Sequence, residues 1–283
     1  MRATFAEIMG ARTRYLHGGS GKAVILVHGV GMSADSWFKT IPALENNFFV
    51  CAPDLLDNGF TEPGPYKGGA PQPYIVDHLI ALADHLKLDK FSVVGSSLGS
   101  AVATLLYLRI PERIEKIIFV GPGSVINQPA ALARVLEAAA TNGRSAVENP
   151  SYESCRSRIA RVVQDPACVP DWLVTMQMTI YALPGALEVF DRRMNGLRAK
   201  SALEEFEVYS KLEKVAAPTL VILGREDPRG DYAEAVAAAK RLPQGRIVTY
   251  EGCGHWPHIE HPNKFSSDVA AFLNTPLSGA RTA

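Results

Sequence analysis

The chain has 283 residues, of which 47% are hydrophobic, and its 29 Lys and Arg residues balance 29 Asp and Glu residues. This composition favours one α/β domain with an insertion, and the zero net charge leaves no basic excess for a nucleic-acid partner. No apolar run reaches the ~18 residues that span a bilayer or resembles a signal-peptide core, so we expect a cytoplasmic protein without a membrane partner. The four cysteines follow no metal-ligand spacing, so we expect reduced thiols and no metal or other cofactor.

Strand and helix patterns alternate over the first part of the chain. The run AVILVH at residues 23–28 is typical of a strand that is buried on both faces. Further strands are predicted at 48–52, 91–95 and 114–120, and helices at 33–45, 73–86 and 98–109, with Ser33 as the N-cap of the first. Because parallel strands need crossover connections, we expect the α/β-hydrolase type of architecture, a mainly parallel sheet with helices on both faces.

This alternation stops between residues 124 and 203, where helical patterns appear without a convincing strand. It resumes with strands at 218–224 and 246–250 and helices at 231–241 and 262–273. Since one sheet needs both flanks, we expect residues 1–123 and 204–283 to form the core and residues 124–203 to form an inserted helical cap.

The pattern G-x-S-x-G occurs once between a predicted strand and a predicted helix, as Gly95-Ser96-Ser97-Leu98-Gly99. A strand that turns directly into a helix projects its turn residue from a strained backbone, and its neighbours at either side must lack bulk. Only Ser97 has glycine at both offsets. We therefore expect Ser97 to be a nucleophile rather than part of a plain turn.

A serine nucleophile needs a base and an acid that orients it. His255 follows the last predicted strand, where its loop reaches the carboxyl end of the sheet, and is the expected general base. The loop after residues 218–224 supplies two acids, of which Asp227 is preferred and Glu226 is the alternative. The order Ser, Asp, His is the one that this fold imposes.

The loop His28-Gly29-Val30-Gly31 follows the first buried strand and is a candidate oxyanion hole. The expected donors are the backbone N–H groups of Val30 and Leu98, with Gly31 as a substitute. Gly29 and Gly31 are also expected to contact substrate. His28 itself is expected to be a structural, hydrogen-bonded histidine.

The sequence resembles the α/β-hydrolase superfamily along nearly its whole length, with HGVG, GSSLG, GRED and GHW in the expected order. More narrowly, IIFVGPGSV, NPSYES, ILGREDP and GCGHWPHIEHP are similar to the meta-cleavage product hydrolases. These enzymes open carbon–carbon bonds in vinylogous 1,5-diketones from aromatic-ring degradation. The resemblance implies catalytic roles for Ser97, Asp227 and His255 and a substrate contact for Trp256.

Members of that family carry a cap arginine that holds the substrate's carboxylate, and the corresponding position here is Gln177. The loops HGVGMSADSW and PDLLDNGFT also depart from the family's usual HGxGPGA and PG-containing turns. We therefore expect neutral substrates to be preferred unless another cap arginine, Arg192, Arg193 or Arg198, substitutes. The cap is also expected to roof an apolar pocket with aromatic and thioether side chains, namely Trp172, Met176, Met178, Tyr181, Phe190 and Met194.

Three functions remain open on the sequence. The first is carbon–carbon bond hydrolysis of a small aromatic-derived diketone, and the second is a carboxylesterase or lactonase acting on a small apolar ester. The third is a non-catalytic ligand receptor that retains the fold. The oligomeric state is open as well, a homo-oligomer included.

Overall fold

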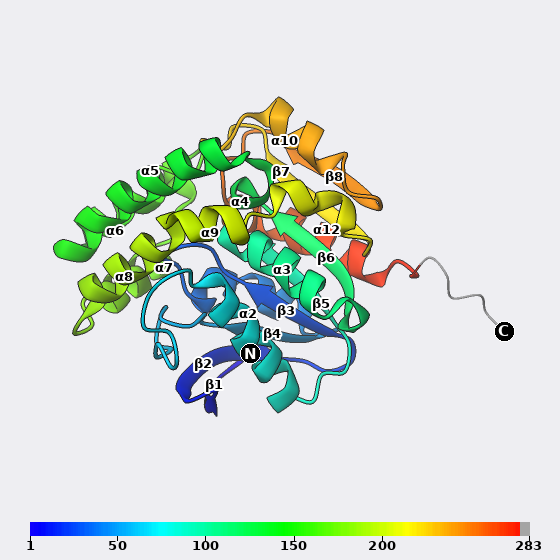
Figure 1. Cartoon of the computed structure of the whole chain (residues 1–283), viewed down its shortest axis with the longest axis horizontal. Helices are drawn as coiled ribbons and strands as arrows, with labels where there is room; N and C mark the ends of the chain where they lie inside the picture. The colour runs from blue at the N-terminus through cyan, green and yellow to red at the C-terminus, as the bar shows by residue number, and fades with distance from the viewer. Residues whose placement is uncertain (278–283) are drawn as a thin grey trace.

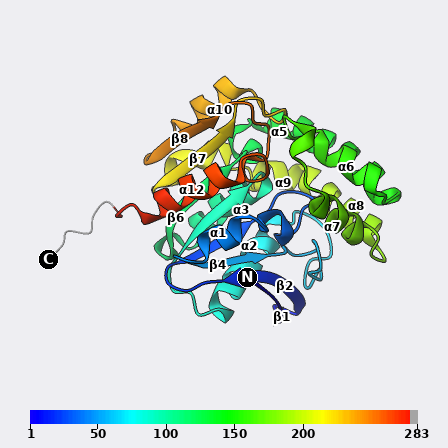
Figure 2. The ribbon, with the colours of Figure 1, turned by 180° about the vertical axis from the view of Figure 1, so that it is seen from behind.

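The strands at the centre of the molecule are apolar runs that need cover on both faces. In the computed structural model, which describes residues 1–277, every position of β3 (Ala23–Val27), β5 (Phe91–Ser96) and β7 (Thr219–Gly224) is buried. Helices lie on both sides of the sheet that these strands form (Figures 1 and 2). This arrangement explains why the runs are continuous rather than alternating.

The sheet has eight strands in the order β1-β2-β4-β3-β5-β6-β7-β8. The six strands from β4 (Phe49–Pro53) through β6 (Ile114–Val120) to β8 (Gly245–Tyr250) are parallel, as expected for the α/β-hydrolase fold. Each of the predicted strands is confirmed to within one residue at either end. Because these strands are parallel, the loops after β3, β5, β7 and β8 all lie at the carboxyl end of the sheet.

The sequence interpretation omitted the N-terminal hairpin of β1 (Arg2–Ile8) and β2 (Ala11–Gly18), which pairs antiparallel with the edge of the sheet. The outer strand β1 is exposed along most of its length and carries charged residues among short apolar ones. An edge strand of this kind has neither a continuous apolar run nor a helical stripe, so the pattern that identified the central strands does not mark it.

Two helical layers cover the sheet faces. The main core helices are α2 (Gln72–His85), α3 (Leu98–Arg109), α10 (Tyr232–Ala239) and α12 (Pro262–Asn274). The short helix α11 (Pro257–Glu260) directly precedes α12. Short 3₁₀ turns connect other elements, at Pro111–Arg113, Pro166–Cys168 and Tyr209–Lys214. One apolar cluster packs on each face, and Trp37 and Phe265 are central to the smaller of the two.

The single helix predicted at residues 33–45 is wrong. The segment forms a 3₁₀ turn at Ala34–Trp37 and a short α1 at Thr40–Leu44. The expected cap is also absent: the Ser33 hydroxyl donates to Asp35 at 2.7 Å instead of accepting a backbone N–H. Asp35 in turn pairs with the buried Arg14, and Pro42, which has no N–H to donate to the carbonyl four residues earlier, interrupts the predicted helix.

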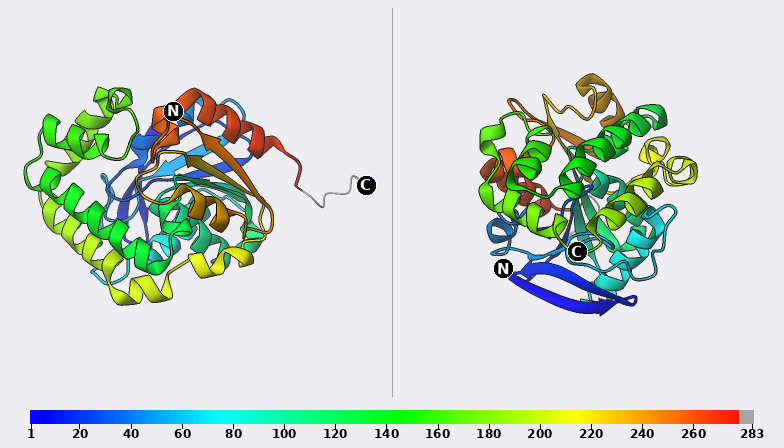
Figure 3. Two further views of the ribbon diagram at one scale, coloured as in Figure 1. Left: turned by 90° about the horizontal axis from the view of Figure 1, so that it is seen from above. Right: turned by 90° about the vertical axis from the view of Figure 1, so that its left-hand side faces the viewer.

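Between β6 and β7 the chain runs through helices without a strand, within residues 124–203. These are α4 (Gly123–Ile126), α5 (Pro129–Glu148), α6 (Tyr152–Ala160), α7 (Asp171–Tyr181), α8 (Ala186–Arg198) and α9 (Lys200–Glu205). They form a layer at one end of the sheet (Figure 3). We keep residues 124–203 as the proposed extent of the cap. Over residues 1–277 no single helix is long and apolar enough to cross a membrane, and α7 with α8 passes that test only as a pair bent by 95°.

Candidate active site

Ser97 occupies a strained turn between β5 and α3. Its backbone has φ 52° and ψ −116°, a region that non-glycine residues rarely adopt. A side-chain carbon at Gly95 would lie 2.2 Å from the carbonyl oxygen of Gly99, and one at Gly99 would lie 2.2 Å from that of Val27. Both flanking glycines are therefore required by backbone atoms, which cannot move aside as side chains do.

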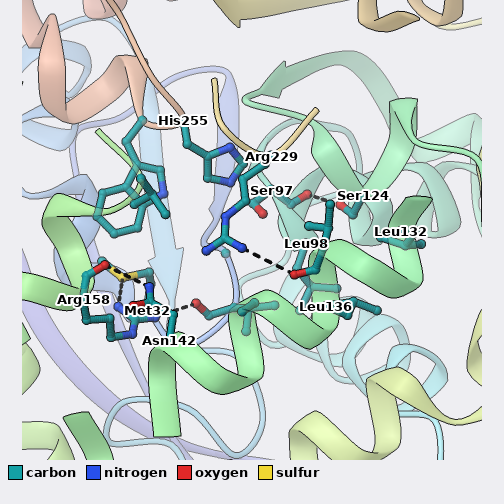
Figure 4. Close-up of a pocket in the computed structure, with 16 residues that line it drawn as sticks. Met32, Ser97, Leu98, Ser124, Leu132, Leu136, Asn142, Arg158, Arg229 and His255 are labelled. Carbon is teal, nitrogen blue, oxygen red and sulfur yellow. Dashed lines mark hydrogen bonds between the residues drawn. The ribbon is translucent and has the colours of Figure 1, made fainter. Parts of the chain in front are cut away.

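The same turn is fixed from the side of β6. The backbone N–H of Ser97 donates to the carbonyl of Val120 at 3.0 Å, and the hydroxyl of Ser124 donates to the carbonyl of Ser97 at 2.5 Å. The Ser97 side chain is thereby directed into a pocket at the carboxyl end of the sheet (Figure 4).

His255 lines the same pocket as Ser97, and Figure 4 draws the two side chains next to each other. Nδ1 of His255 lies 2.8 Å from Oδ2 of Asp227, and the second carboxylate oxygen of Asp227 accepts the backbone N–H of Arg229 at 2.8 Å. The alternative acid Glu226 is exposed and accepts the backbone N–H of Cys253 at 2.9 Å. The structure thus places Asp227, and not Glu226, beside the histidine.

The histidine loop is also bound to the cap. The backbone N–H of His255 donates to the carbonyl of Val162, in the turn after α6, at 2.7 Å. The carboxylate of Glu260 accepts three further N–H groups, from Gly254 at 2.9 Å, Trp256 at 3.1 Å and Gln164 at 2.8 Å. One acid therefore links the loop that carries His255 to the cap.

The loop after β3 closes the pocket beside Ser97. A side-chain carbon at Gly29 would lie 3.1 Å from Cβ and 3.8 Å from Oγ of Ser97, so a larger residue at this position would crowd the nucleophile. Val30 and Leu98 both line the pocket. Leu98 is the first residue of α3, where backbone N–H groups lack intrahelical partners and the helix dipole favours negative charge.

His28 holds this loop in place, as expected for a structural histidine. Its Nε2 accepts the backbone N–H of Leu55 at 3.0 Å, so Nδ1 carries the proton and donates to the carbonyl of Gly29 at 2.8 Å. Full burial lowers the pKa of His28 to about 4, which keeps the ring neutral.

The cap covers the pocket with helices other than those expected. The pocket-lining residues of α5 are Leu132, Val135, Leu136, Ala139 and Asn142, and the cap also contributes Ser124, Arg158 and Val162. None of the six expected roof residues lines this pocket in the described chain. Trp172 instead stacks against Phe38, with ring centroids 5.2 Å apart, while Tyr181 and Phe190 line a second cavity together with Gly31. Trp172 and Gly31 therefore do not line the pocket that contains Ser97 in the described chain, whereas Trp256 does.

Gln177 is buried behind the pocket and does not line it within the described residues. Its Oε1 accepts a hydrogen bond from Nη1 of Arg158 at 3.1 Å, while Nη2 of Arg158 donates to the carbonyl of Val30 at 3.2 Å. The Arg158 guanidinium also lies 5.6 Å from the ring centroid of Tyr181. The glutamine thus positions an arginine that faces the pocket.

The three cap arginines expected to substitute for the family's arginine all point elsewhere. Arg192 forms an ion pair with Asp57, Arg193 lines the second cavity, and Arg198 pairs with Glu137. Within residues 1–277, none of the three lines the pocket that contains Ser97.

Sequence reasoning missed Arg158 and Arg229, the two arginines that do line the pocket. A signal for Arg158 exists: on α6 it shares the buried face with Cys155 and Ile159, so a charge interrupts an apolar helical stripe. Arg229 lies in an irregular loop, where no periodic pattern indicates the direction of a side chain. Within residues 1–277, no group of three or more His, Cys, Asp or Glu side chains could hold a metal ion.

Comparisons with known proteins agree with this geometry. A family model described as the alpha/beta hydrolase fold matches residues 22–262. The chain is 28% identical over 269 residues to 2-hydroxymuconate semialdehyde hydrolase of Pseudomonas sp. strain CF600, covering 93% of this chain and 91% of that protein. It is 26% identical to 2-hydroxy-6-oxo-6-(2'-aminophenyl)hexa-2,4-dienoic acid hydrolase of Metapseudomonas resinovorans, over 99% and 93% of the two chains.

Among solved structures, 2-hydroxy-6-oxo-6-phenylhexa-2,4-dienoate hydrolase from Rhodococcus sp. strain RHA1 superposes with a TM-score of 0.80 at 25% identity, over 97% of this chain and 100% of that one. The meta-cleavage product hydrolase CumD of Pseudomonas fluorescens IP01 gives a TM-score of 0.77 at 26% identity, over 96% and 97%. The resemblance to meta-cleavage product hydrolases is confirmed. The chain belongs to the α/β-hydrolase fold family, and it is an enzyme of the hydrolase class.

Proposed function

We propose that this enzyme hydrolyses a carbon–carbon bond in a dienoate formed by aromatic-ring cleavage. The observation that carries the proposal is the guanidinium of Arg158, which lines the pocket beside Ser97 and within residues 1–277 is bound only to neutral groups. A buried cation without an acidic partner favours an anionic ligand. The relatives named for such dienoates supply the substrate class.

In the proposed reaction Asp227 holds the proton of His255 on Nδ1, so that Nε2 is free to accept the proton of the Ser97 hydroxyl. The dienol is first converted to its keto form, and Ser97 Oγ then attacks the ketone. Backbone N–H groups of Val30 and Leu98 stabilise the oxyanion. The carbon–carbon bond breaks as the electron pair moves into the dienolate, which takes up a proton, and water releases the acyl group from Ser97 as a carboxylic acid.

Arg158 takes the part that the resemblance assigns to position 177. Since Gln177 contacts Arg158 directly, the positive charge is moved by one helix, from α7 to α6, and remains at the pocket. A guanidinium binds a carboxylate by charge-assisted paired hydrogen bonds, which an amide cannot supply. We therefore replace the expected preference for neutral substrates by a preference for the free acid.

A carboxylesterase or lactonase is the second candidate, and the apolar wall of α5 favours it. Leu132, Val135, Leu136 and Ala139 offer a surface that suits a small apolar acyl group. The same nucleophile and base would serve that reaction. The two candidates differ in what they require of Arg158.

The test compares kcat/KM for a ring-cleavage dienoate and its matched methyl ester. We expect the wild type to prefer the free acid by about tenfold or more, and Arg158→Met to lose that preference. Arg156→Met is the matched control, because Arg156 lies on the same helix but binds carbonyls of Pro166 and Val169 outside the pocket. Efficient hydrolysis of aryl esters with no turnover of either dienoate would assign the esterase function instead. Ligand binding with no Ser97-dependent turnover of any substrate would identify a receptor.

A further inference from the structure

A second guanidinium reaches the pocket from the core side. Arg229 follows Asp227 by two residues in the loop between β7 and α10, and its backbone N–H is held by the Asp227 carboxylate at 2.8 Å. Its side chain turns toward α5, where Nη1 donates to the carbonyl of Val135 at 3.4 Å. Figure 4 shows the guanidinia of Arg229 and Arg158 in the same pocket.

The hydrogen-bonding capacity of Arg229 is largely unused. A guanidinium carries several N–H donors, and within residues 1–277 its side chain makes that one long hydrogen bond and no ion pair with an acidic side chain. Burial lowers the pKa of Arg229, and repulsion from Arg158 lowers it further, while Asp227 raises it. Arginine nevertheless stays protonated, so the pocket contains two partly desolvated cations. An anionic group of the substrate, bound beside these arginines, would offset the cost of desolvating them.

The two arginines contact different walls of the pocket. Arg158 extends from α6 to the loop that contains Val30, beside Gln177. Arg229 extends from the loop after β7 to α5, whose residues along one face form the apolar wall of the pocket. A carboxylate that pairs with Arg158 alone would leave the charge of Arg229 without an acidic partner.

We propose that the substrate carries a second carboxylate, at the far end of the acyl group that Ser97 accepts, and that Arg229 binds it. The inference rests on the proposed function, in which Arg158 binds the dienoate carboxylate. The acyl group would be a short ω-carboxyalkyl chain whose methylene groups pack on the apolar face of α5 while its acid reaches the guanidinium. Hydrolysis would then release a dicarboxylic acid from the acyl side.

Two substrate pairs test this proposal. The first pair consists of dienoates whose acyl ends are an alkyl chain and an ω-carboxyalkyl chain of equal length. The second pair consists of p-nitrophenyl pentanoate and mono-p-nitrophenyl glutarate, which carry the same difference without a dienoate. Ser97→Ala provides the background rate for every compound. The measured quantity is the ratio of kcat/KM for the acidic and the neutral member of each pair.

We expect the wild type to favour the acidic member by about tenfold or more, and Arg229→Met to bring the ratio near unity. Arg229→Lys should retain part of the preference because it keeps the charge but loses the paired geometry. Arg225→Met is the control, since Arg225 lies on the same loop but is exposed and pairs with Glu251. A loop-fixing role for Arg229 would change both members of a pair equally and leave the ratio intact.

The outcomes separate this inference from the function on which it rests. A preference for the glutarate ester that depends on Arg229, with no turnover of either dienoate, would support the acyl carboxylate and overturn carbon–carbon hydrolysis. Turnover of both dienoates at equal kcat/KM would support carbon–carbon hydrolysis and overturn the second carboxylate. An acidic preference that survives in Arg229→Met would also overturn it.

Discussion

The two walls of the pocket are built in different ways. On the core wall, positions are set by backbone atoms: a side-chain carbon at Gly99 would clash with the carbonyl of Val27, and the Ser97 turn is held by a hydrogen bond to the carbonyl of Val120. On the cap wall, positions are set by side chains: Arg158 is held by Gln177 and by a carbonyl of the oxyanion loop. Backbone contacts leave almost no room for change, whereas side-chain contacts can be exchanged one at a time.

This difference separates chemistry from substrate choice. The groups that we propose to react, on Ser97 and His255, come from loops at strand ends of the core. The residues proposed to choose the substrate include Arg158 from the cap and Arg229 from a long core loop. Substitutions at the groups that we propose to react should therefore lower kcat for every substrate, and substitutions at Arg158 or Arg229 should change the ratio between substrates.

The largest effect is expected at the nucleophile. Ser97→Ala should lower kcat by about a millionfold for all substrates, because no other group can form the acyl intermediate. An active-site phosphonate should label the wild type rapidly at Ser97 alone, as mass spectrometry of the peptides would show. Ser96→Ala is the neighbouring control and should keep the labelling. Full-rate labelling of a different serine in Ser97→Ala would contradict the assignment.

A smaller loss is expected at the acid that orients the base. Asp227→Asn should lower kcat by about 10⁴-fold, because an amide no longer favours the histidine tautomer with its proton on Nδ1. Glu226→Gln should have little effect on kcat, since that carboxylate is exposed and binds only a backbone N–H. Steady-state kinetics of the two variants decide the question, and a greater loss in Glu226→Gln would reverse the roles.

Alanine substitutions of glycines on the two walls should differ in their effect on the free energy of unfolding. Gly99→Ala would place a methyl group 2.2 Å from a backbone carbonyl and should cost at least about 3 kcal/mol in free energy of unfolding. Gly143→Ala in α5 would place a methyl group 2.6 Å from the ring of Phe190 and 3.8 Å from Nε of Arg158, both side-chain atoms, and a helical alanine is itself favourable by about 1 kcal/mol. Its net effect should stay within about 1 kcal/mol. Urea unfolding of both variants tests the contrast, which fails if the two losses are equal.

The last prediction concerns how the free energy of unfolding depends on pH in acid. Burial lowers the pKa of His28 and His78 to about 4 and that of His258 to about 3, all in the core, while residues 124–203 contain no histidine. The unfolded chain takes up these protons below its ordinary value of 6.5 and the folded chain does not. The stability from neutral histidine is thus complete above 6.5 and is lost as pH falls toward about 4.

Each such histidine should reduce the free energy of unfolding by about 1.4 kcal/mol per pH unit in that window. His78→Gln should therefore make urea unfolding less dependent on pH, because glutamine takes up no proton. His85→Gln, on the exposed face of the same helix, is the control and should keep the wild-type dependence. A slope that is identical in His78→Gln and the wild type would contradict the assignment.

The parallel strands and the loops that follow them could be predicted because each depends on local pattern. A buried strand gives a continuous apolar run, and the nucleophile turn requires glycine at fixed offsets from Ser97. The hairpin of β1 and β2 was missed because an exposed edge strand has no such run. The helix expected from Ser33 was wrong because its predicted span contains Pro42, which cannot donate the hydrogen bond of a continuous helix, and because the Ser33 hydroxyl binds Asp35 instead of capping a helix.

The substrate-facing side chains could be predicted only in part, because their direction depends on how the cap helices pack. Position 177 was identified by counting along the sequence, yet the charge lies at Arg158, nineteen residues earlier in the chain and adjacent in space. Trp172 looked like a pocket residue by composition and packs instead on Phe38. Helical spacing gives the face of a helix, and tertiary contacts decide what that face meets.

The hydrogen bond from His255 to the carbonyl of Val162 has a consequence for protein engineering. A cap transplanted from another hydrolase would bring its substrate contacts and would also replace the carbonyl that orients the base. Such a chimaera keeps its catalytic rate only if the incoming segment presents a carbonyl at this point and an N–H to Glu260 at the position of Gln164. Substrate contacts and the position of the base therefore change together when this segment is exchanged. An exchange of cap helices that begins after Gln164 would leave the contacts of Val162 and Gln164 in place.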